Sequence, residues 1–288
     1  MMGHSPGDNL LAAPERRGYD TAKMPLALEH IRRMRGGAQS HLMRCDDGSY
    51  YVVKFQNNPQ HRRVLVNELL GTRLAARLGL PTAPSAVVEV RRELIENTAE
   101  LVMQVGASQQ PCEAGFQFGS RYPGDPARLA VHDFLPDERL AAVENLPDFA
   151  GILAFDKWAC NTNGRQAIFF LDAGASQYKA WMIDQGFCFN AGAWNFPDSP
   201  LRGIYTRSRV YEGVRGMEAF EPWFERIERL AQPKELDAFS SEIPPDWYQG
   251  DTGALYELLE RLCRRPGQLP EMILEAKKSY RQPFRNWA

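Results

Sequence analysis

The sequence has 288 residues, of which 44% are hydrophobic and 24% charged, and its formal net charge is −2. This length suits one large domain or two lobes that share a cleft. The balanced charge gives no indication of binding to nucleic acid or to a membrane surface. No apolar run in the sequence approaches the roughly 20 residues that span a bilayer, so we expect a soluble protein.

The cysteines and the first residues of the chain indicate the compartment. The number of cysteines is five and no two of them form a C-x-x-C pair, so neither a disulfide framework nor a zinc site is predicted. The first residues of the chain lack the apolar core of a signal peptide. We therefore expect a cytoplasmic protein with reduced thiols.

The first part of the chain is predicted to be rich in strands. Residues 1–24 are polar and rich in glycine and proline, and we predict a flexible tail there. From about residue 26 to 93 the patterns predict strand, strand, strand, helix, strand. The β-forming run 50–55 is one of these strands. The helix is expected over 63–78, where apolar residues recur at helical spacing, and Gly79 marks its end.

The second part of the chain is predicted to be more helical. Two further strands are expected before it, at 100–105 and 115–122. The expected elements of the second part are a helix at 140–159, short strands at 167–171 and 179–183, and helices near 217–231, 252–264 and 270–278. A β-rich part followed by a helical part predicts two unequal lobes. We expect a nucleotide-binding N-lobe over 25–122 and a C-lobe over 123–288.

A lysine and a glutamate form the first part of a candidate site. Lys54 lies on an apolar strand, where its charge needs an anion or access to water. A surface lysine on an edge strand is the alternative interpretation. Glu68 follows Val64 and Leu65 by four and three residues, which places it beside the buried face of its helix. An acid there needs a cation, and Lys54 is the candidate partner; a glutamate that reaches solvent is the alternative.

Two aspartates and an asparagine form the second part. Asp156 is followed five positions later by Asn161, which is the spacing of a phosphotransferase catalytic loop. In such a loop the aspartate accepts or orients the proton of the attacking hydroxyl, and the asparagine binds Mg²⁺. Asp184 leaves a β-like run and is followed by Gly186, as in a metal-binding D-x-G turn. An ordinary turn at the end of a strand is the alternative for Asp184.

The order of these residues along the chain is that of a two-lobed kinase. Lys54 would hold the phosphates of ATP and Glu68 would hold Lys54, while Asn161 and Asp184 would place Mg²⁺. A loop that covers the phosphates is expected before Lys54, because glycines let backbone amides approach phosphates closely. The residues in that position are Gly36, Gly37, Ala38, Gln39 and Ser40. A plain turn is the alternative interpretation of the two glycines.

Taken together, these motifs resemble the HipA-like kinase family. The resemblance runs from about residue 26 to 280. The segments that carry it are Gly37-Ala38-Gln39, Val-Val-Lys54-Phe, Asn67-Glu68, Phe155-Asp156-Lys-Trp-Ala-Cys-Asn161-Thr-Asn163 and Trp-Met-Ile-Asp184-Gln-Gly186. It implies an α+β, bilobal protein-kinase-like fold, with a β-rich N-lobe that contains one helix and a mainly helical C-lobe.

The resemblance also implies an activity. Such a kinase would transfer the γ-phosphate of ATP, with Mg²⁺, to a serine or threonine of a protein or peptide. Larger members act as toxins paired with an antitoxin, so the resemblance also implies an antitoxin-like partner as an expectation. This chain is shorter and is similar to small stand-alone bacterial members. Members can be autophosphorylated in the glycine loop, and Ser40 is the residue to which that hypothesis applies.

The sequence departs from the family pattern in three places. Gln185 stands where kinases usually carry the phenylalanine of D-F-G, and Ala154-Phe155 stands where His-Arg precedes the catalytic aspartate. Family members often carry an aspartate two residues after the metal-binding asparagine. The residue at that position is Asn163, so one negative charge near the metal is lost.

Three other functions compete with a protein kinase. A small-molecule kinase of the aminoglycoside or choline type uses the same D-x-x-x-x-N and D-x-G motifs. Such kinases usually show His-Gly-Asp at the catalytic aspartate, where this chain has Phe155-Asp156. A nucleotide-binding pseudokinase is favoured by the neutral Asn163. Transfer of AMP instead of phosphate, on a kinase-like scaffold, is the third, and product analysis separates it from the others.

Overall fold

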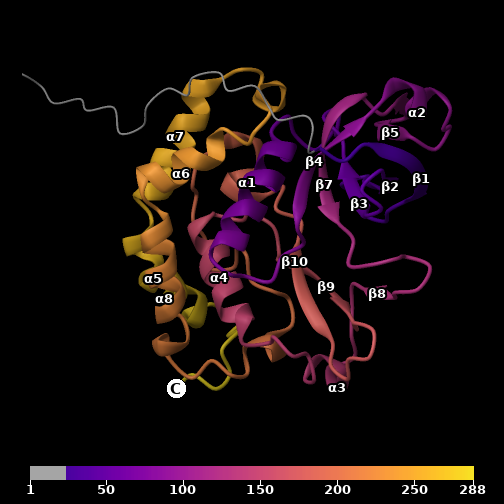
Figure 1. The fold of residues 1–288 in the computed structure, drawn as a ribbon. Coiled ribbons are helices and arrows are strands. Elements are labelled where there is room, and N and C mark those ends of the chain that lie inside the picture. The colour runs from indigo at the N-terminus through magenta and orange to yellow at the C-terminus, as the bar shows by residue number, and fades with distance from the viewer. Residues whose placement is uncertain (1–23) are drawn as a thin grey trace, which may run out of the picture.

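A computed structural model describes residues 24–288 (Figure 1). The predicted tail over 1–24 lies outside these residues except for its last position. The first part of the chain forms a five-stranded antiparallel sheet with the strand order β1-β2-β3-β7-β4. Its strands are β1 Ala27–Arg33, β2 His41–Cys45, β3 Tyr50–Lys54, β4 Ser85–Val90 and β7 Gly115–Arg121.

Smaller elements complete the first part. They are the helix α2 Arg92–Glu96 and the hairpin formed by β5 Val102–Val105 and β6 Ser108–Pro111. Met103 of this hairpin packs with Val53 and Phe55 in an apolar cluster that has no exposed surface at these three residues. This cluster gives the sheet a core of its own, separate from the larger core to which helix α1 (Val64–Arg77) and the helical part contribute.

Helix α1, Val64–Arg77, joins the sheet to the rest of the molecule. It contacts β4 and β7 on one side, and helix α6 (Pro233–Ser240) and the segment after Asp184 on the other. Because it is covered from both sides, even its polar residues Asn67 and Glu68 are buried. The helix ends where Gly79 adopts a left-handed φ of +79°, a conformation that glycine reaches without steric cost.

The second part of the chain begins with a small three-stranded sheet of order β10-β9-β8. Its strands are β8 Val131–His132, β9 Gln166–Phe170 and β10 Lys179–Ile183. Helices α3 Asp137–Leu140 and α4 Asp148–Trp158 lie between β8 and β9 in the chain. Thr82, which follows α1, forms a parallel bridge with Met182, so the two parts of the molecule meet at β10.

The remaining four helices complete the second part of the chain (Figure 1). They are α5 Glu221–Leu230, α6 Pro233–Ser240, α7 Thr252–Cys263 and α8 Leu269–Lys278. Of these, α5 and α8 contact α4, which is buried over most of its length, while α6 contacts α1 and α7. Short 3-10 turns occur at Cys188–Ala193, Ser208–Tyr211, Met217–Ala219, Pro245–Tyr248 and Pro266–Gln268. The α4 glycine Gly151 is required by packing, since a Cβ atom there would lie 2.3 Å from the ring of Trp223.

The main elements predicted from periodicity are confirmed, with differences at their ends. The helix predicted over 140–159 is shorter, because α4 begins at Asp148, directly after Pro147. Proline is suited to the start of a helix but not to its interior. The sequence did not indicate α6, nor the two short strands β6 and β8, whose four and two residues are too few for a periodic pattern.

Candidate active site

A cavity of about 400 Å³ lies between the five-stranded sheet and the β9–β10 hairpin. Seven of the residues predicted from the sequence line it: Gly36, Gly37, Ala38, Ser40, Lys54, Glu68 and Asp184. Apolar side chains line another part of it, among them Val52, Phe118, Ile168 and Met182. An apolar wall with a few convergent polar groups is typical of a small-molecule site, and here the polar groups include Lys54 together with the acids Glu68 and Asp184.

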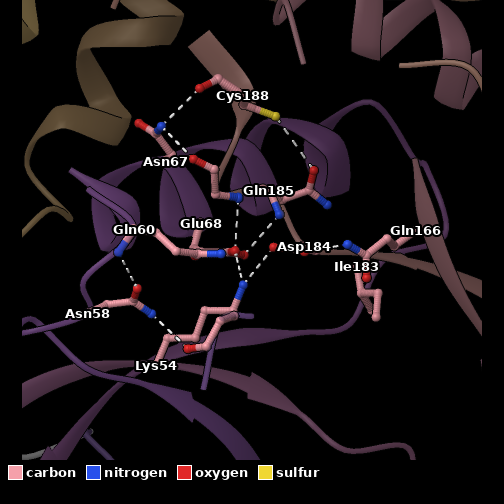
Figure 2. Close-up of polar contacts among 12 residues, drawn as sticks. Lys54, Asn58, Gln60, Asn67, Glu68, Gln166, Ile183, Asp184, Gln185 and Cys188 are labelled. Atoms are coloured by element: carbon pink, nitrogen blue, oxygen red, sulfur yellow. Dashed lines mark hydrogen bonds and ion pairs between the residues drawn. The ribbon is translucent and has the colours of Figure 1, made fainter. Parts of the chain in front are cut away.

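Lys54 and Glu68 form a buried ion pair at the back of this cavity (Figure 2). The Nζ atom of Lys54 contacts Oε1 of Glu68 and also lies 2.7 Å from Oδ1 of Asp184. Burial lowers the pKa of Lys54, but the charges of Glu68 and Asp184 outweigh burial and raise that pKa above its usual value. Lys54 is therefore a permanent cation at neutral pH.

Glu68 also holds the backbone of the D-x-G turn. Its Oε2 atom accepts a hydrogen bond from the amide of Gln185 at 3.0 Å, and its Oε1 atom accepts one from the amide of Gly186 at 2.8 Å. Burial raises the pKa of Glu68 and attraction to Lys54 lowers it, with a raised pKa as the result. A single carboxylate thus connects α1, the Lys54 strand and the turn after β10.

Asp184 adopts a left-handed backbone conformation with φ of +64°, which is uncommon outside glycine and typical of functional turns. Burial raises its pKa, but Lys54 outweighs burial and the net pKa of Asp184 is lowered. Its second oxygen, Oδ2, accepts a hydrogen bond of 2.7 Å from Nε2 of Gln166. Asp184 is therefore a carboxylate that faces the cavity at neutral pH.

Asn67 clamps the segment that follows Asp184. Its Nδ2 group donates to the carbonyls of Gly186, Cys188 and Ala191, each at 2.9 Å, and its Oδ1 atom accepts from Nε1 of Trp194 at 2.8 Å. The side chain has no exposed surface. This segment contains four left-handed residues, at Phe189, Asn190, Ala191 and Trp194. Since such residues cost about 1–3 kcal/mol each, the clamp offsets strain next to the site.

The glycine loop over 36–40 is anchored above the cavity. Asn58 donates from Nδ2 to the carbonyl of Ala38 at 2.7 Å, and Gly36 has a left-handed φ of +109°. Gln39 does not line the cavity. Its side chain exchanges two hydrogen bonds with the backbone of Gln104, of 2.7 and 2.9 Å, and so ties the loop to β5.

Asp156 lies behind the cavity and does not line it. Both carboxylate oxygens accept from the guanidinium of Arg165, with 2.8 Å between Nε and Oδ2, and Asn161 donates to Oδ1 at 3.0 Å. The side chain of Asp156 has 0% exposed surface. Gly203 covers it, because a Cβ atom there would lie 2.3 Å from the Cβ of Asp156. The predicted role of Asp156 as proton acceptor stays a prediction.

Asn161 is also buried, and both ends of its amide are bonded. Nδ2 donates to Asp156, and Oδ1 accepts from the amide of Asn163 at 3.1 Å. Asn161 is 1% exposed and does not line the cavity. Because an amide oxygen can accept two partners, the predicted metal-binding roles of Asn161 and Asp184 both stay predictions. The polar residues that this loop contributes to the cavity are Asn163 and Gln166.

The donor set suits a metal that is brought by a ligand. In residues 24–288, no group of three or more His, Cys, Asp or Glu side chains is arranged to hold a metal ion. Mg²⁺ at nucleotide sites is held by one or two carboxylates together with phosphates and water. Asp184, with the neutral amides of Asn163 and Gln166 nearby, fits that arrangement.

Sequence reasoning missed Arg165 and Gln166. Strand alternation was the available signal. Arg165 shares the buried face of its strand with Ala167 and Phe169, while Gln166 and Ile168 face the cavity. Applying the period of two to the predicted strand at 167–171, and extending it backwards by two residues, places Gln166 in the site.

The family follows from a direct comparison. The model of the family described as HipA-like kinase matches residues 28–190, which is more than half of the chain. The chain belongs to the HipA-like kinase family. The predicted resemblance is thereby confirmed, and the family is one of phosphotransferases. Comparison with curated proteins found no match for this HipA-like kinase.

Solved structures give the fold. The proinflammatory kinase CtkA of Helicobacter pylori is 12% identical with a TM-score of 0.56, covering 87% of this chain and 96% of CtkA. The Golgi casein kinase with Mn/ADP bound is 14% identical with a TM-score of 0.47, covering 90% and 74% of the two chains. HipA of Shewanella oneidensis, in complex with HipB and operator DNA, is 12% identical with a TM-score of 0.42, covering 85% and 68%.

The likeness to CtkA confirms the predicted protein-kinase-like fold, with a β-rich first part containing one long helix and a helical second part. Among the helices of residues 24–288, none is long and apolar enough to cross a membrane.

Proposed function

We propose that this HipA-like kinase binds ATP with Mg²⁺ in the cavity and transfers the γ-phosphate to a serine or threonine hydroxyl of a protein. The observation that carries the proposal is the position of Lys54, which lies between Glu68 and Asp184 at the back of the cavity. The α and β phosphates of ATP would meet the ammonium group of Lys54. The amides of the glycine loop over 36–40 would approach the phosphates from above.

The residues of the chain would act mainly by placing charge. Phosphoryl transfer needs stabilisation of charge on the transferred group more than covalent chemistry by the protein. Glu68 fixes the position of Lys54, and Lys54 would withdraw charge from the phosphates. Asp184 would hold Mg²⁺, which neutralises phosphate charge when it is bound. The apolar wall of Val52, Phe118 and Met182 would receive the base.

We keep Asp156 as the proposed proton acceptor of the substrate hydroxyl. That role requires its carboxylate to leave Arg165, because both oxygens accept hydrogen bonds from that guanidinium. In the arrangement described above, stabilisation of charge would therefore contribute more to the rate than removal of the proton.

A second candidate is nucleotide binding without transfer. It is favoured by the burial of Asp156 and by the neutral Asn163, which lines the cavity at the place where an acid was expected. The division into an N-lobe over 25–122 and a C-lobe over 123–288 is part of the proposal. A cytoplasmic location and an antitoxin-like partner stay predictions.

Incubation with labelled ATP separates these functions. Wild type, Asp184→Asn and Asp156→Asn are incubated with γ-labelled ATP, Mg²⁺ and a cell lysate. The proposal expects label on a protein band, on serine or threonine, and no label with Asp184→Asn. Label confined to small molecules would identify a small-molecule kinase, and label from α-labelled ATP would identify transfer of AMP. Bound ATP without any transferred label would identify the second candidate.

The Asp156→Asn variant tests the proton acceptor separately. Loss of label with this variant, at unchanged ATP affinity, supports Asp156 as the acceptor. Wild-type labelling with Asp156→Asn would reject that role and leave the charge-stabilising residues as the whole catalytic apparatus.

A further inference from the structure

Asn163 and Gly164 form the one Asn-Gly pair in the sequence. They lie in the loop between α4 and β9, where both residues are exposed and outside helices and strands. Asn163 lines the candidate cavity together with Lys54 and Asp184. Glycine has no Cβ atom to shield its backbone nitrogen, so the side-chain amide of Asn163 is followed by an unusually accessible backbone nitrogen.

The geometry of the loop brings these two groups together. The backbone nitrogen of Gly164 donates to Oδ1 of Asn163 at 2.9 Å, so it lies next to Cγ, the carbon that carries this oxygen. Among residues 24–288 this nitrogen donates to no backbone carbonyl, so no turn or ladder bond holds it. Apart from its chain neighbours, the nearest described atom to a Cβ atom on Gly164 would be the carbonyl oxygen of Ile204, at 3.9 Å. The loop therefore leaves space for the pair to rearrange.

Other asparagines of the chain lack one of these conditions. Asn161 is 1% exposed and is followed by Thr162, a β-branched residue whose Cβ shields its own backbone nitrogen. Asn97 is exposed, but it also precedes a threonine, and its Nδ2 group donates to the carbonyl of Glu93 at 2.8 Å. Exposure, an unshielded following nitrogen and a direct contact between the two groups occur together at Asn163.

We propose that Asn163 is a deamidation site, at which the cavity gains a carboxylate after the chain has folded. The nitrogen of Gly164 attacks Cγ of Asn163, and the new N–C bond closes a five-membered succinimide ring. The bond from Cγ to the side-chain nitrogen breaks, and this nitrogen leaves as ammonia with the proton of the Gly164 amide. Water then opens the ring and leaves aspartate or isoaspartate at position 163. The net reaction consumes one water and releases one ammonia, without oxidant, reductant or cofactor.

The aspartate product preserves the course of the backbone. The main-chain carbonyl of Asn163 accepts from the amide of Gly203 at 3.2 Å, and ring opening at Cγ leaves this carbonyl in place. The product adds a negative charge to a cavity that Glu68 and Asp184 already line. The consequence for the ligand rests on the proposed binding of ATP, because like charges repel and the phosphates of metal-free ATP are negative.

Mass spectrometry of the folded, full-length protein tests the deamidation without any nucleotide. Wild type is kept at mildly alkaline pH, samples are digested at acidic pH, and the peptide that contains position 163 is followed over time. The matched variant is Gly164→Ala, which keeps Asn163 and whose added Cβ atom meets nothing closer than 3.9 Å apart from its chain neighbours. Wild type unfolded in urea shows the rate of the sequence alone, and the Asn97 peptide is the internal control.

The peptide of folded wild type is expected to gain the mass of an exchange of NH₂ for OH and to separate into aspartate and isoaspartate forms. The Asn97 peptide and the Gly164→Ala protein should show no gain over the same interval. No gain at Asn163 in folded wild type, while the unfolded chain converts, would overturn the inference. Equal conversion in Gly164→Ala would overturn the assignment of the Gly164 nitrogen as the attacking atom.

Calorimetric titration with metal-free ATP tests the consequence for the cavity. Asn163→Asp reproduces the aspartate product, and Gln177→Glu makes the same change of charge at an exposed glutamine that does not line the cavity. Asn163→Asp is expected to raise the Kd for ATP about twofold to fivefold, the order of effect for exposed charges, and Gln177→Glu to leave it unchanged. Equal Kd values in all three proteins would overturn the consequence. A wild type that binds no ATP would overturn the proposed function, whereas the mass measurement would still decide the deamidation.

Discussion

The Nζ atom of Lys54 lies 2.7 Å from Oδ1 of Asp184, although 130 positions separate the two residues in the chain. Lys54 comes from the sheet of the first part, and Asp184 from the turn after β10 of the second part. Glu68 of α1 accepts hydrogen bonds from Lys54 and from the backbone amide of Gln185, the residue after Asp184. The ion pair therefore joins the two parts of the fold at the point where the phosphates of a nucleotide are proposed to bind.

Replacing Lys54 by methionine removes the cation and leaves the buried acid Glu68 near the partly buried acid Asp184. We expect Lys54→Met to lower the free energy of unfolding by about 3 kcal/mol at pH 7, the order found when one partner of a buried ion pair is removed. The loss should shrink as the pH falls towards 5. Glu68, whose pKa is already raised by burial, binds a proton in the folded variant and gains stability below its folded pKa.

Urea unfolding of wild type and Lys54→Met at pH 7 and pH 5 measures this dependence. An equal loss at both values would contradict a buried Glu68 that has lost its counter-ion. Arg44→Met is a suitable control, since its salt bridge with Glu29 is largely exposed and exposed pairs contribute only about 0–1 kcal/mol.

Asn67 is predicted to be the residue that holds the segment after Asp184. Asn67→Leu keeps the volume but leaves three carbonyls and the Trp194 indole without their partner. Since each unsatisfied buried group costs about 1–3 kcal/mol, we expect a loss of at least about 3 kcal/mol in urea unfolding. Asn97→Leu, which removes one exposed hydrogen bond to Glu93, should cost less than about 1 kcal/mol. Similar losses in both variants would refute the clamp.

Asp156 and Arg165 should behave as one unit in a double-mutant cycle. Each of Asp156→Asn and Arg165→Met leaves the other side chain buried and unpaired, so each should cost about 3–5 kcal/mol. The double variant should cost less than the sum of the two, with a coupling energy on the order of 2 kcal/mol. Additive losses, measured by urea unfolding of the four proteins, would show that the two side chains do not interact.

A substitution at Gly203 tests how tightly the loop around Gly203 packs against Asp156. Gly203→Ala adds a Cβ atom 2.3 Å from the Cβ of Asp156 at a φ of +74°. Gly174 has a similar φ of +79° with nothing within 4 Å of the added atom, so Gly174→Ala reports the backbone cost alone, about 1 kcal/mol. We expect Gly203→Ala to lose at least about 2 kcal/mol more, as for other overpacked sites. Equal midpoints of thermal unfolding would contradict this packing.

The fold could be predicted to a large extent because its elements carry local signals. The strand at 50–55 is indicated by its β-forming residues and the helix at 63–78 by its helical spacing of apolar residues. They are found as β3 and α1. The helix predicted at 140–159 was too long at its start, because apolar residues continue through a turn that Pro147 separates from α4. Short strands such as β8 form because they pair with a neighbouring strand, here β9, and their few residues show no periodic pattern in the sequence.

The site could be predicted only where a residue's role follows from its immediate neighbours. Lys54 and Glu68 were paired because a charge on an apolar face needs a counter-ion, and they contact each other. Spacing alone could not reveal that Asp156 is enclosed, since Arg165 reaches it from the position directly before β9 and Gly203 from a distant loop. Gln39 likewise turns away from the cavity because of Gln104, 65 positions later.

Binding of ATP with and without Mg²⁺, measured by isothermal titration calorimetry on wild type and Asp184→Asn, tests the central claim most directly. The account predicts that Mg²⁺ increases the ATP affinity of wild type at least about tenfold, and that this increase disappears in Asp184→Asn, because the carboxylate that faces the cavity is then neutral. The same Mg²⁺-dependent increase in Asp184→Asn, or no ATP binding by wild type, would contradict the assignment of this cavity as a nucleotide and metal site.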